Sequence, residues 1–215
     1  MYRIKKTNSV SIAVIAVIQL TFFLCSRAHG REAMAGIISN TKEDIAASEQ
    51  VAGDFASSVG DFFGAIGRTD KVVAQVAKGS GTAALADEQS ALSAIKTFID
   101  KLAQTETALK ELKERAKSGK QSEAMQRAMG MTWDDYFDGL VDEIGRVRKS
   151  LNRFVARDKE VAERHIKDGN IRGLIDDTGP LAADMVVSVT DMVNHWVRNA
   201  VASHRAMDVV YKVRD

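Results

Sequence analysis

The chain has 215 residues, of which 45% are apolar and 27% charged, and its formal net charge is +1. This balance excludes a disordered chain and an integral membrane bundle, and it predicts a globular fold. A single proline and an aromatic content of 6% argue against a β-sandwich or barrel, because such folds need many turns and aromatic strands. We therefore expect an all-α protein.

Residues 1–30 have the pattern of a secretory signal peptide. The basic start MYRIKK precedes an apolar run of 16 residues from Val10 to Cys25, whereas a membrane-spanning helix needs about 20 apolar residues. Small residues at positions 28 and 30 fit a cleavage site, and Ala33 and Ala35 offer a second one. We therefore expect the first 30 residues to be removed during export.

The remaining residues, 31–215, are expected to form a single helical-bundle domain. They contain 26 basic and 29 acidic residues, a net charge of −3, and no cysteine, because Cys25 is the only one in the chain. They also contain no Asn-x-Ser/Thr sequence, so N-glycosylation is not expected. We expect a secreted, extracellular protein, or a periplasmic one if the source is bacterial, whose stability comes from packing.

Apolar residues recur at heptad spacing in the segments 38–66 and 82–117, which is typical of helices that pack side by side. In the first segment they are Ile38, Ile45, Ala52, Val59 and Ile66, with Phe55 and Phe62 between them. In the second they are Leu85, Leu92 and Ile99 in one register and Ile95, Leu102, Leu109 and Ala116 in another. Thr82 is the expected N-cap of the second helix, and Gly119 marks its expected end.

The first segment also contains four glycines: Gly53, Gly60, Gly64 and Gly67. Each glycine in a helix interior costs about 1 kcal/mol relative to alanine. We expect that the close approach of a neighbouring helix offsets this cost, or that the helix is flexible or broken at its end.

The segment 133–168 has the clearest pattern, an alternation of four- and three-residue steps between core positions. These positions are Trp133, Phe137, Leu140, Ile144, Val147, Leu151, Phe154, Val161 and His165, with Asp158 as a polar interruption. Thr132 followed by Asp135 predicts a capping box at the start of this helix, and Gly169 predicts its end.

A fourth helix is expected to begin at Thr178-Gly179-Pro180, because proline is favoured at the first helical position. Its core positions are Met185, Val189, Met192, Trp196, Ser203 and Val210. A short helix is expected over 122–131, between the second and third long ones. The sequence thus predicts an elongated antiparallel bundle of about four long amphipathic helices with heptad-like seams.

The segment 168–179 partly resembles a calcium-binding loop. Asp168 and Asn170 fit ligand positions of such a loop, whereas Arg172 and Gly179 stand where other ligands belong. The favoured interpretation is an ordinary connection between two helices, and calcium binding is left open.

Residues that could bind a metal or carry out catalysis are few. Asp191, His195 and Asn199 lie one turn apart on the fourth helix and could share a face, while His165 is expected in the core. The sequence has no Glu-x-x-His pair, Gly-x-Ser-x-Gly motif or phosphate-binding loop, and each of these carries a specific chemistry. We therefore expect no metal site, no cofactor and no enzymatic activity.

Four basic residues lie along one face of the third helix: Arg146, Lys149, Arg153 and Arg157. This face is the candidate interaction face for an anionic partner. Pairing with Asp142 or Glu160 on the same helix is the alternative explanation for the charges. Nucleic acid is not an expected partner, because residues 31–215 are net acidic and the chain is expected to be exported.

Phe62 and Phe63 are the candidate lipid-contacting residues. They are adjacent in the glycine-rich part of the first helix, where few charges occur, and such a segment could insert into a lipid surface. Core packing is the favoured interpretation, because Asp54 and Asp61 interrupt the apolar face.

These observations predict a secreted, non-enzymatic helical-bundle protein that acts through protein–protein interaction with a host, cell-surface or self partner. The alternative is an apolipoprotein-like protein that opens its bundle to bind lipid or an apolar ligand. The polar core positions Asp158 and Ser203 would lower the cost of opening. The narrow apolar seams favour the first hypothesis, because binding at a lipid interface needs a wide apolar face.

Overall fold

The computed structural model of the chain describes residues 42–119 and 121–211. Within these ranges the secondary structure is helical, without strands, which confirms the all-α prediction. The predicted signal peptide, Cys25 and Ile38 lie outside the described residues. The helices are α3 (Lys42–Ala77), α4 (Gly81–Ser118), α5 (Ser122–Met129), α6 (Trp133–Lys167) and α7 (Ile171–Tyr211).

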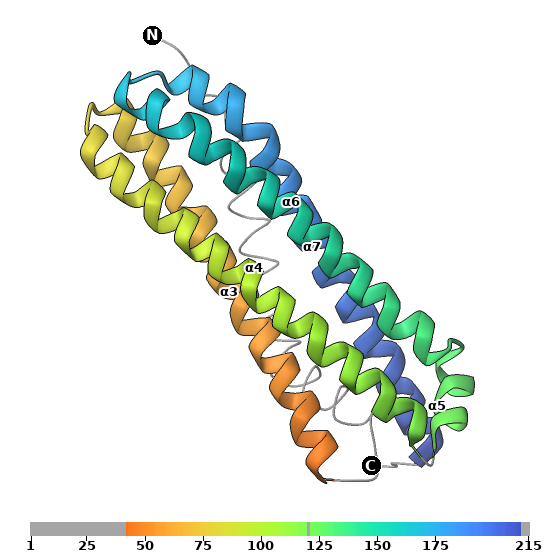
Figure 1. Cartoon of the computed structure of the whole chain (residues 1–215). Helices are drawn as coiled ribbons and strands as arrows, with labels where there is room; N and C mark the ends of the chain where they lie inside the picture. Colours follow the sequence, from red (N-terminus) through yellow and green to blue (C-terminus); the bar gives the residue numbers. More distant parts are fainter. Residues whose placement is uncertain (1–41, 120, 212–215) are drawn as a thin grey trace.

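The four long helices form an elongated antiparallel bundle (Figure 1), as the sequence predicts. We call α3 and α4 the first hairpin and α6 and α7 the second hairpin. The interface of α4 with α6 is the most extensive contact between the two hairpins. The described helices number five rather than about four, because the short helix α5 packs against α7 at one end of the bundle.

The predicted seam of α6 is buried along its whole length, and each of its ten positions has a relative exposure of 8% or less. One hydrophobic core includes side chains from all five helices. Within it, the rings of Phe55 on α3 and Trp196 on α7 stack with centroids 4.0 Å apart. A smaller cluster lies near the connections α3–α4 and α6–α7 and consists of Val72, Val76, Ala84, Ala162, Ile166 and Leu174.

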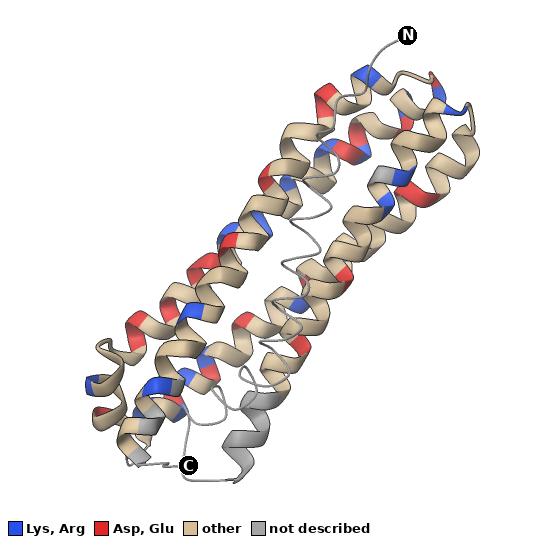
Figure 2. Ribbon diagram, turned by 180° about the vertical axis from the view of Figure 1, so that it is seen from behind, with Lys and Arg blue, Asp and Glu red and all other residues tan. Residues whose placement is uncertain are grey.

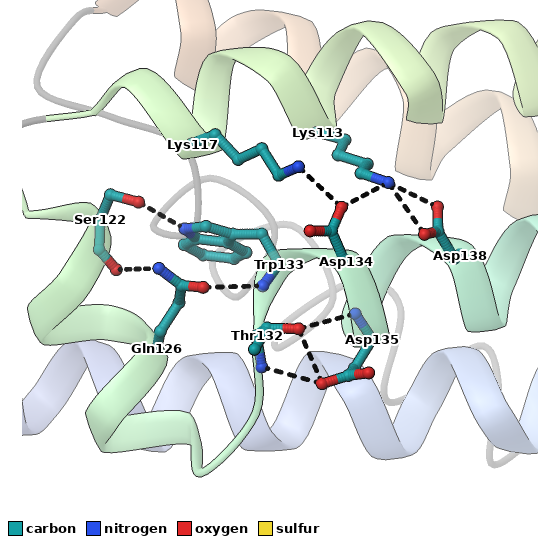
Figure 3. A network of polar contacts seen from close by, with 9 residues as sticks. All are labelled: Lys113, Lys117, Ser122, Gln126, Thr132, Trp133, Asp134, Asp135 and Asp138. Atoms are coloured by element: carbon teal, nitrogen blue, oxygen red, sulfur yellow. Dashed lines mark hydrogen bonds and ion pairs between the residues drawn. The ribbon is translucent and has the colours of Figure 1, made fainter.

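The start of α6 is fixed by the predicted capping box. Asp135 N donates to Thr132 Oγ1 over 3.0 Å, and Thr132 N donates to Asp135 Oδ2 over 3.3 Å. Next to this cap, Trp133 Nε1 donates to Ser122 Oγ of α5 over 2.8 Å (Figure 3). These bonds hold α5 against the start of α6.

Ion pairs join the same end of α6 to α4 (Figure 3). Lys113 of α4 contacts Asp134 at 2.6 Å and Asp138 at 2.7 Å, and Lys117 contacts Asp134 at 2.7 Å. Each aspartate lies at an exposed position of α6. The pairs therefore sit at the rim of the α4–α6 interface and fix its register.

The predicted start of the fourth helix is wrong. The helix α7 begins at Ile171, so Pro180 lies inside it rather than at its first position. The reason is a compact turn: Gly169 adopts a positive φ of 64°, and Asn170 Oδ1 accepts a hydrogen bond from Gly173 N over 2.9 Å. An asparagine that caps the first turn starts the helix early, and most of the calcium-like segment 168–179 is therefore helical.

The start of α4 also differs from the prediction. Thr82 is not the N-cap, because α4 begins at Gly81 and the capping position is occupied by Ser80. The Ser80 side chain makes no capping hydrogen bond. The predicted end at Gly119 is confirmed, since α4 ends at Ser118 with Gly119 as its C-cap.

At the four glycines of the first helix, the described residues show neither the close approach of a neighbouring helix nor a break in the helix. A Cβ atom added at Gly53, Gly60, Gly64 or Gly67 would meet nothing within 4 Å among the described residues, and α3 continues through all four positions. Close helix approach is instead found at Gly173, where an added Cβ would lie 2.5 Å from His165 Cε1. Nothing in the structure explains the glycines of α3.

This contrast predicts opposite effects of two glycine-to-alanine substitutions. We expect Gly64→Ala to stabilise the chain by about 0.5 to 1 kcal/mol, because alanine lowers the entropy cost of helix formation and finds open space. We expect Gly173→Ala to destabilise it by about 1 to 3 kcal/mol, because the new methyl group overlaps the imidazole of His165. Urea denaturation measures both changes, and effects of the same sign would contradict the packing described for α3 and α7.

Candidate functional site

The predicted basic face on α6 separates into paired and unpaired residues. Arg146 contacts Glu143 at 2.5 Å, and Arg157 contacts Asp177 of α7 at 3.0 Å and Glu160 at 3.2 Å. The expected pairing with Glu160 is thus confirmed, whereas Glu143 takes the place expected for Asp142. The two residues at the ends of the basic face, Arg146 and Arg157, are therefore neutralised by acids.

Lys149 and Arg153, in the middle of the basic face, are exposed and form no ion pair or hydrogen bond with other described residues. They are one helical turn apart, which is about 6 Å along the helix axis. Both signs of charge are distributed along the length of the bundle (Figure 2). Lys149 and Arg153 are therefore two neighbouring positive charges that no acid of residues 42–119 or 121–211 contacts.

A shallow hollow of about 580 Å³ lies beside these two cations. Among the described residues, only α6 lines it, because small side chains alternate with long ones along the helix surface. Its six lining residues, which we call the α6 basic trough, are Gly145, Arg148, Lys149, Asn152, Arg153 and Ala156. The cations were predicted from the sequence, but the small residues Gly145, Asn152 and Ala156 were not, although their spacing of seven and four positions places them on one face.

The third cation of the trough, Arg148, is held by α4. Its guanidinium contacts Glu106 at 2.8 Å, and the pKa of Glu106 lies below its usual range because Lys110 hydrogen-bonds to it and Arg148 adds its positive charge. Glu106 is thus shared between Arg148 and Lys110. Lys149 and Arg153 are the cations of the trough that have no acidic partner among the described residues.

A second hollow, of about 690 Å³, lies between α6 and α7. It contains Glu143 and Asp191 as well as Arg146 and Arg198. Its charges of opposite sign are balanced, so it has no preference for a partner of one charge.

The polar seam residue Asp158 faces a second acid, Glu88 of α4, which the sequence analysis missed. Glu88 is 6% exposed and Asp158 is 3% exposed. Burial, hydrogen bonding to Asp158 and the charge of Asp158 together raise the pKa of Glu88 to about 9, and burial is the largest of these causes. Glu88 lies four residues after Ala84 and three before Ala91, and both alanines are buried positions of α4. This helical spacing was the signal in the sequence that Glu88 is buried.

His165, predicted in the core, is buried and hydrogen-bonded to α7. Its Nε2 lies 2.8 Å from Asp177 Oδ2, and Asp177 also accepts from Arg157. Hydrogen bonds from His165 and then from Arg157 lower the pKa of Asp177. The network joins α6 to α7 near the turn that connects them.

The candidate metal face on the fourth helix is not assembled. His195 Nδ1 lies 3.5 Å from Glu143 Oε1, and Asn199 Nδ2 donates to the carbonyl of Tyr136 over 3.2 Å, while Asp191 is exposed. Within residues 42–119 and 121–211, no three His, Cys, Asp or Glu side chains are grouped in a way that could hold a metal ion.

The candidate lipid-contacting residues, Phe62 and Phe63, are both buried, with exposures of 0% and 6%. Phe62 stacks on Phe98 of α4 with ring centroids 5.0 Å apart. These side chains can reach a lipid surface only if the two helices of the first hairpin separate. None of the described helices has the length and apolar character of a membrane span.

Comparison of the chain with protein-family models, with curated proteins and with solved structures finds no match.

The Asp177 network predicts a stability effect that depends on pH. Since its pKa is lowered from 3.8 in the folded chain, Asp177 stabilises the fold above about pH 4, and this contribution is lost as the pH falls through the folded-state pKa. We expect Asp177→Asn to lower the melting temperature at about pH 7 and to have a much smaller effect at about pH 2.5.

Asp176→Asn is the matched control, because Asp176 is the exposed neighbour whose only described partner is Arg172 at 3.5 Å. Thermal melts followed by circular dichroism compare the two variants with the unmodified chain. An equal effect of Asp177→Asn at both pH values would contradict the electrostatic role of the network.

Proposed function

We propose that this chain is a non-enzymatic interaction protein that binds an acidic segment of a protein partner through the α6 basic trough. The observation that carries the proposal is the pair Lys149 and Arg153, which is exposed and without an acidic partner among the described residues. Unpaired cations at adjacent turns are available for carboxylates without the prior breaking of an internal ion pair.

The shape of the trough supports an extended or helical acidic segment as the ligand. The trough is lined in part by residues that project little from the helix, namely Gly145, Asn152 and Ala156. The backbone of a partner can therefore lie close to the α6 backbone. Two carboxylates one helical turn apart would match the spacing of Lys149 and Arg153. Such a ligand places its charges over the two free cations and its small side chains over the small residues of the trough.

The setting we propose is extracellular. The signal-peptide pattern of residues 1–30 supports export. The net charge of −3 for residues 31–215 argues against a general attraction to acidic molecules, so recognition depends on the local trough.

Lipid binding is less well supported. The large exposed apolar side chains of the described residues are all on α7, where they lie among polar positions: Ile175, Val187, Val201 and Val209. A lipid-binding function would need the bundle to open, whereas the basic trough is exposed in the closed fold.

The proposal predicts that reversing the two free charges abolishes binding to an acidic peptide. We expect Lys149→Glu/Arg153→Glu to weaken binding of a labelled peptide with glutamates four residues apart by at least about tenfold, which is about 1.4 kcal/mol. Fluorescence anisotropy at two salt concentrations measures this affinity, and added salt should weaken binding to the unmodified chain.

The control is Lys71→Glu/Lys96→Glu, which makes the same change in net charge at exposed positions of α3 and α4. We expect this variant to bind nearly as well as the unmodified chain. Equal losses in both double variants would show that only net charge matters, and unchanged binding in Lys149→Glu/Arg153→Glu would refute the site. Binding to anionic vesicles but not to the peptide would identify lipid as the partner and refute the proposal.

A further inference from the structure

The buried acids Glu88 and Asp158 lie in the interface that joins the two hairpins. Glu88 belongs to α4 of the first hairpin and Asp158 to α6 of the second, and the α4–α6 interface is the most extensive contact between them. The ion pairs between described residues across this interface join opposite charges, for example Lys113 with Asp138 and Arg148 with Glu106. The pair Glu88–Asp158 joins two groups that repel each other when both are ionised.

One proton converts this repulsion into an attraction. Two carboxylates in a site of low polarity cannot both remain charged, whereas a carboxyl and a carboxylate share a hydrogen bond. Asp158 Oδ2 is buried and accepts no hydrogen bond from a described backbone, hydroxyl, amide or basic group. A protonated Glu88 carboxyl is the donor that the site offers to Asp158.

Three charged groups on the elements around the pair are bound to partners of their own. On α3, Arg68 bonds to Ser90 over 3.3 Å, and on α4 Asp87 accepts from Gln75 over 2.9 Å. On α7, Asp177 is bound to Arg157 and His165. The pKa of each acid of the pair responds to burial and to the other acid, with no contribution from these groups.

We propose that Glu88 and Asp158 form a shared-proton latch, in which one proton holds α4 to α6 and its loss separates the two hairpins at this end of the bundle. The small apolar cluster lies next to the latch, since Ala84 is one turn from Glu88 and Ala162 one turn from Asp158. Separation at the latch would expose this cluster to water. The latch is independent of the proposed partner binding.

The direction of the pH effect follows from proton linkage. The pKa of Glu88 is about 9 in the folded chain and near 4.5 when the chain is unfolded. Between these values the folded state holds a proton that the unfolded or locally opened state releases, so stability falls as the pH rises. The latch is therefore tight in mild acid and loosens towards alkaline pH.

Hydrogen exchange of the full chain tests the latch directly. We compare amide protection, corrected for intrinsic exchange rates, in segments 81–95 and 154–167 with protection in segment 106–118 from about pH 5.5 to about pH 8.5. Protection next to the latch is expected to fall by up to about tenfold per pH unit, and protection in the distant segment is expected to fall less.

Glu88→Gln is the decisive variant, because its amide donates a hydrogen bond to Asp158 at every pH in this range. We expect it to remove the extra pH dependence and to increase protection near the latch at about pH 8.5 by at least about tenfold. Glu111→Gln is the matched control, since Glu111 is an exposed acid on the same helix. It should behave like the unmodified chain.

A pH dependence in Glu88→Gln equal to that of the unmodified chain would overturn the proposal. If this variant does not fold, carbon-13 NMR of the carboxyl groups in the unmodified chain decides the question. A Glu88 carboxyl that titrates above pH 7 supports the latch, and one that titrates near its ordinary value of 4.5 refutes it.

Discussion

Burial of the α6 seam between α4 and α7 holds the bundle together. The seam places a core residue at every helical turn from Trp133 to His165, and burial of one large apolar side chain contributes about 1.5 to 3 kcal/mol. Burying a polar group without full compensation costs about 1 to 3 kcal/mol in proteins. Eight apolar seam residues therefore outweigh the cost of Asp158, and the interface tolerates an acid in its interior.

The polar contacts across the α4–α6 interface determine its alignment rather than most of its strength. They occur at three levels: Lys113 with Asp138, Glu106 with Arg148, and Glu88 with Asp158. The residue numbers rise on one helix and fall on the other, which fixes the antiparallel register. Partly exposed ion pairs such as the first two contribute about 0 to 1 kcal/mol each, so the apolar seam supplies the stability and the polar contacts select one register.

The long helices were predictable because their signal is periodic and repeated over many turns. All ten seam positions of α6 are buried as predicted, and the capping box of Thr132 and Asp135 is present. The start of α7 was not predictable in the same way, because Pro180 and Gly179 are strong local signals for a helix start or a turn. The cap at Asn170 and the packing of Gly173 against His165 decide the start instead.

The candidate site was predictable only in part, for a related reason. The sequence places four cations on one face of α6, but it does not show which acids from other helices reach them. Arg157 is neutralised partly by Asp177, which lies 20 positions away on α7, and no short-range pattern indicates this contact. Glu88 was missed because a glutamate on a helix is usually solvated, and its partner is on a different helix.

Both proposed features are carried by α6, on opposite sides of the helix. Asp158 faces α4 across the interface between the hairpins, whereas the adjacent Arg157 binds Asp177 and so ties α6 to α7. Loss of the proton therefore weakens the contact of α6 with the first hairpin and leaves its contact with α7 in place. Lys149 and Arg153 belong to α6 alone, and their spacing is set by the helix itself. The basic trough consequently keeps its geometry whether the latch is closed or open, and the latch governs exposure of the apolar cluster rather than binding at the trough.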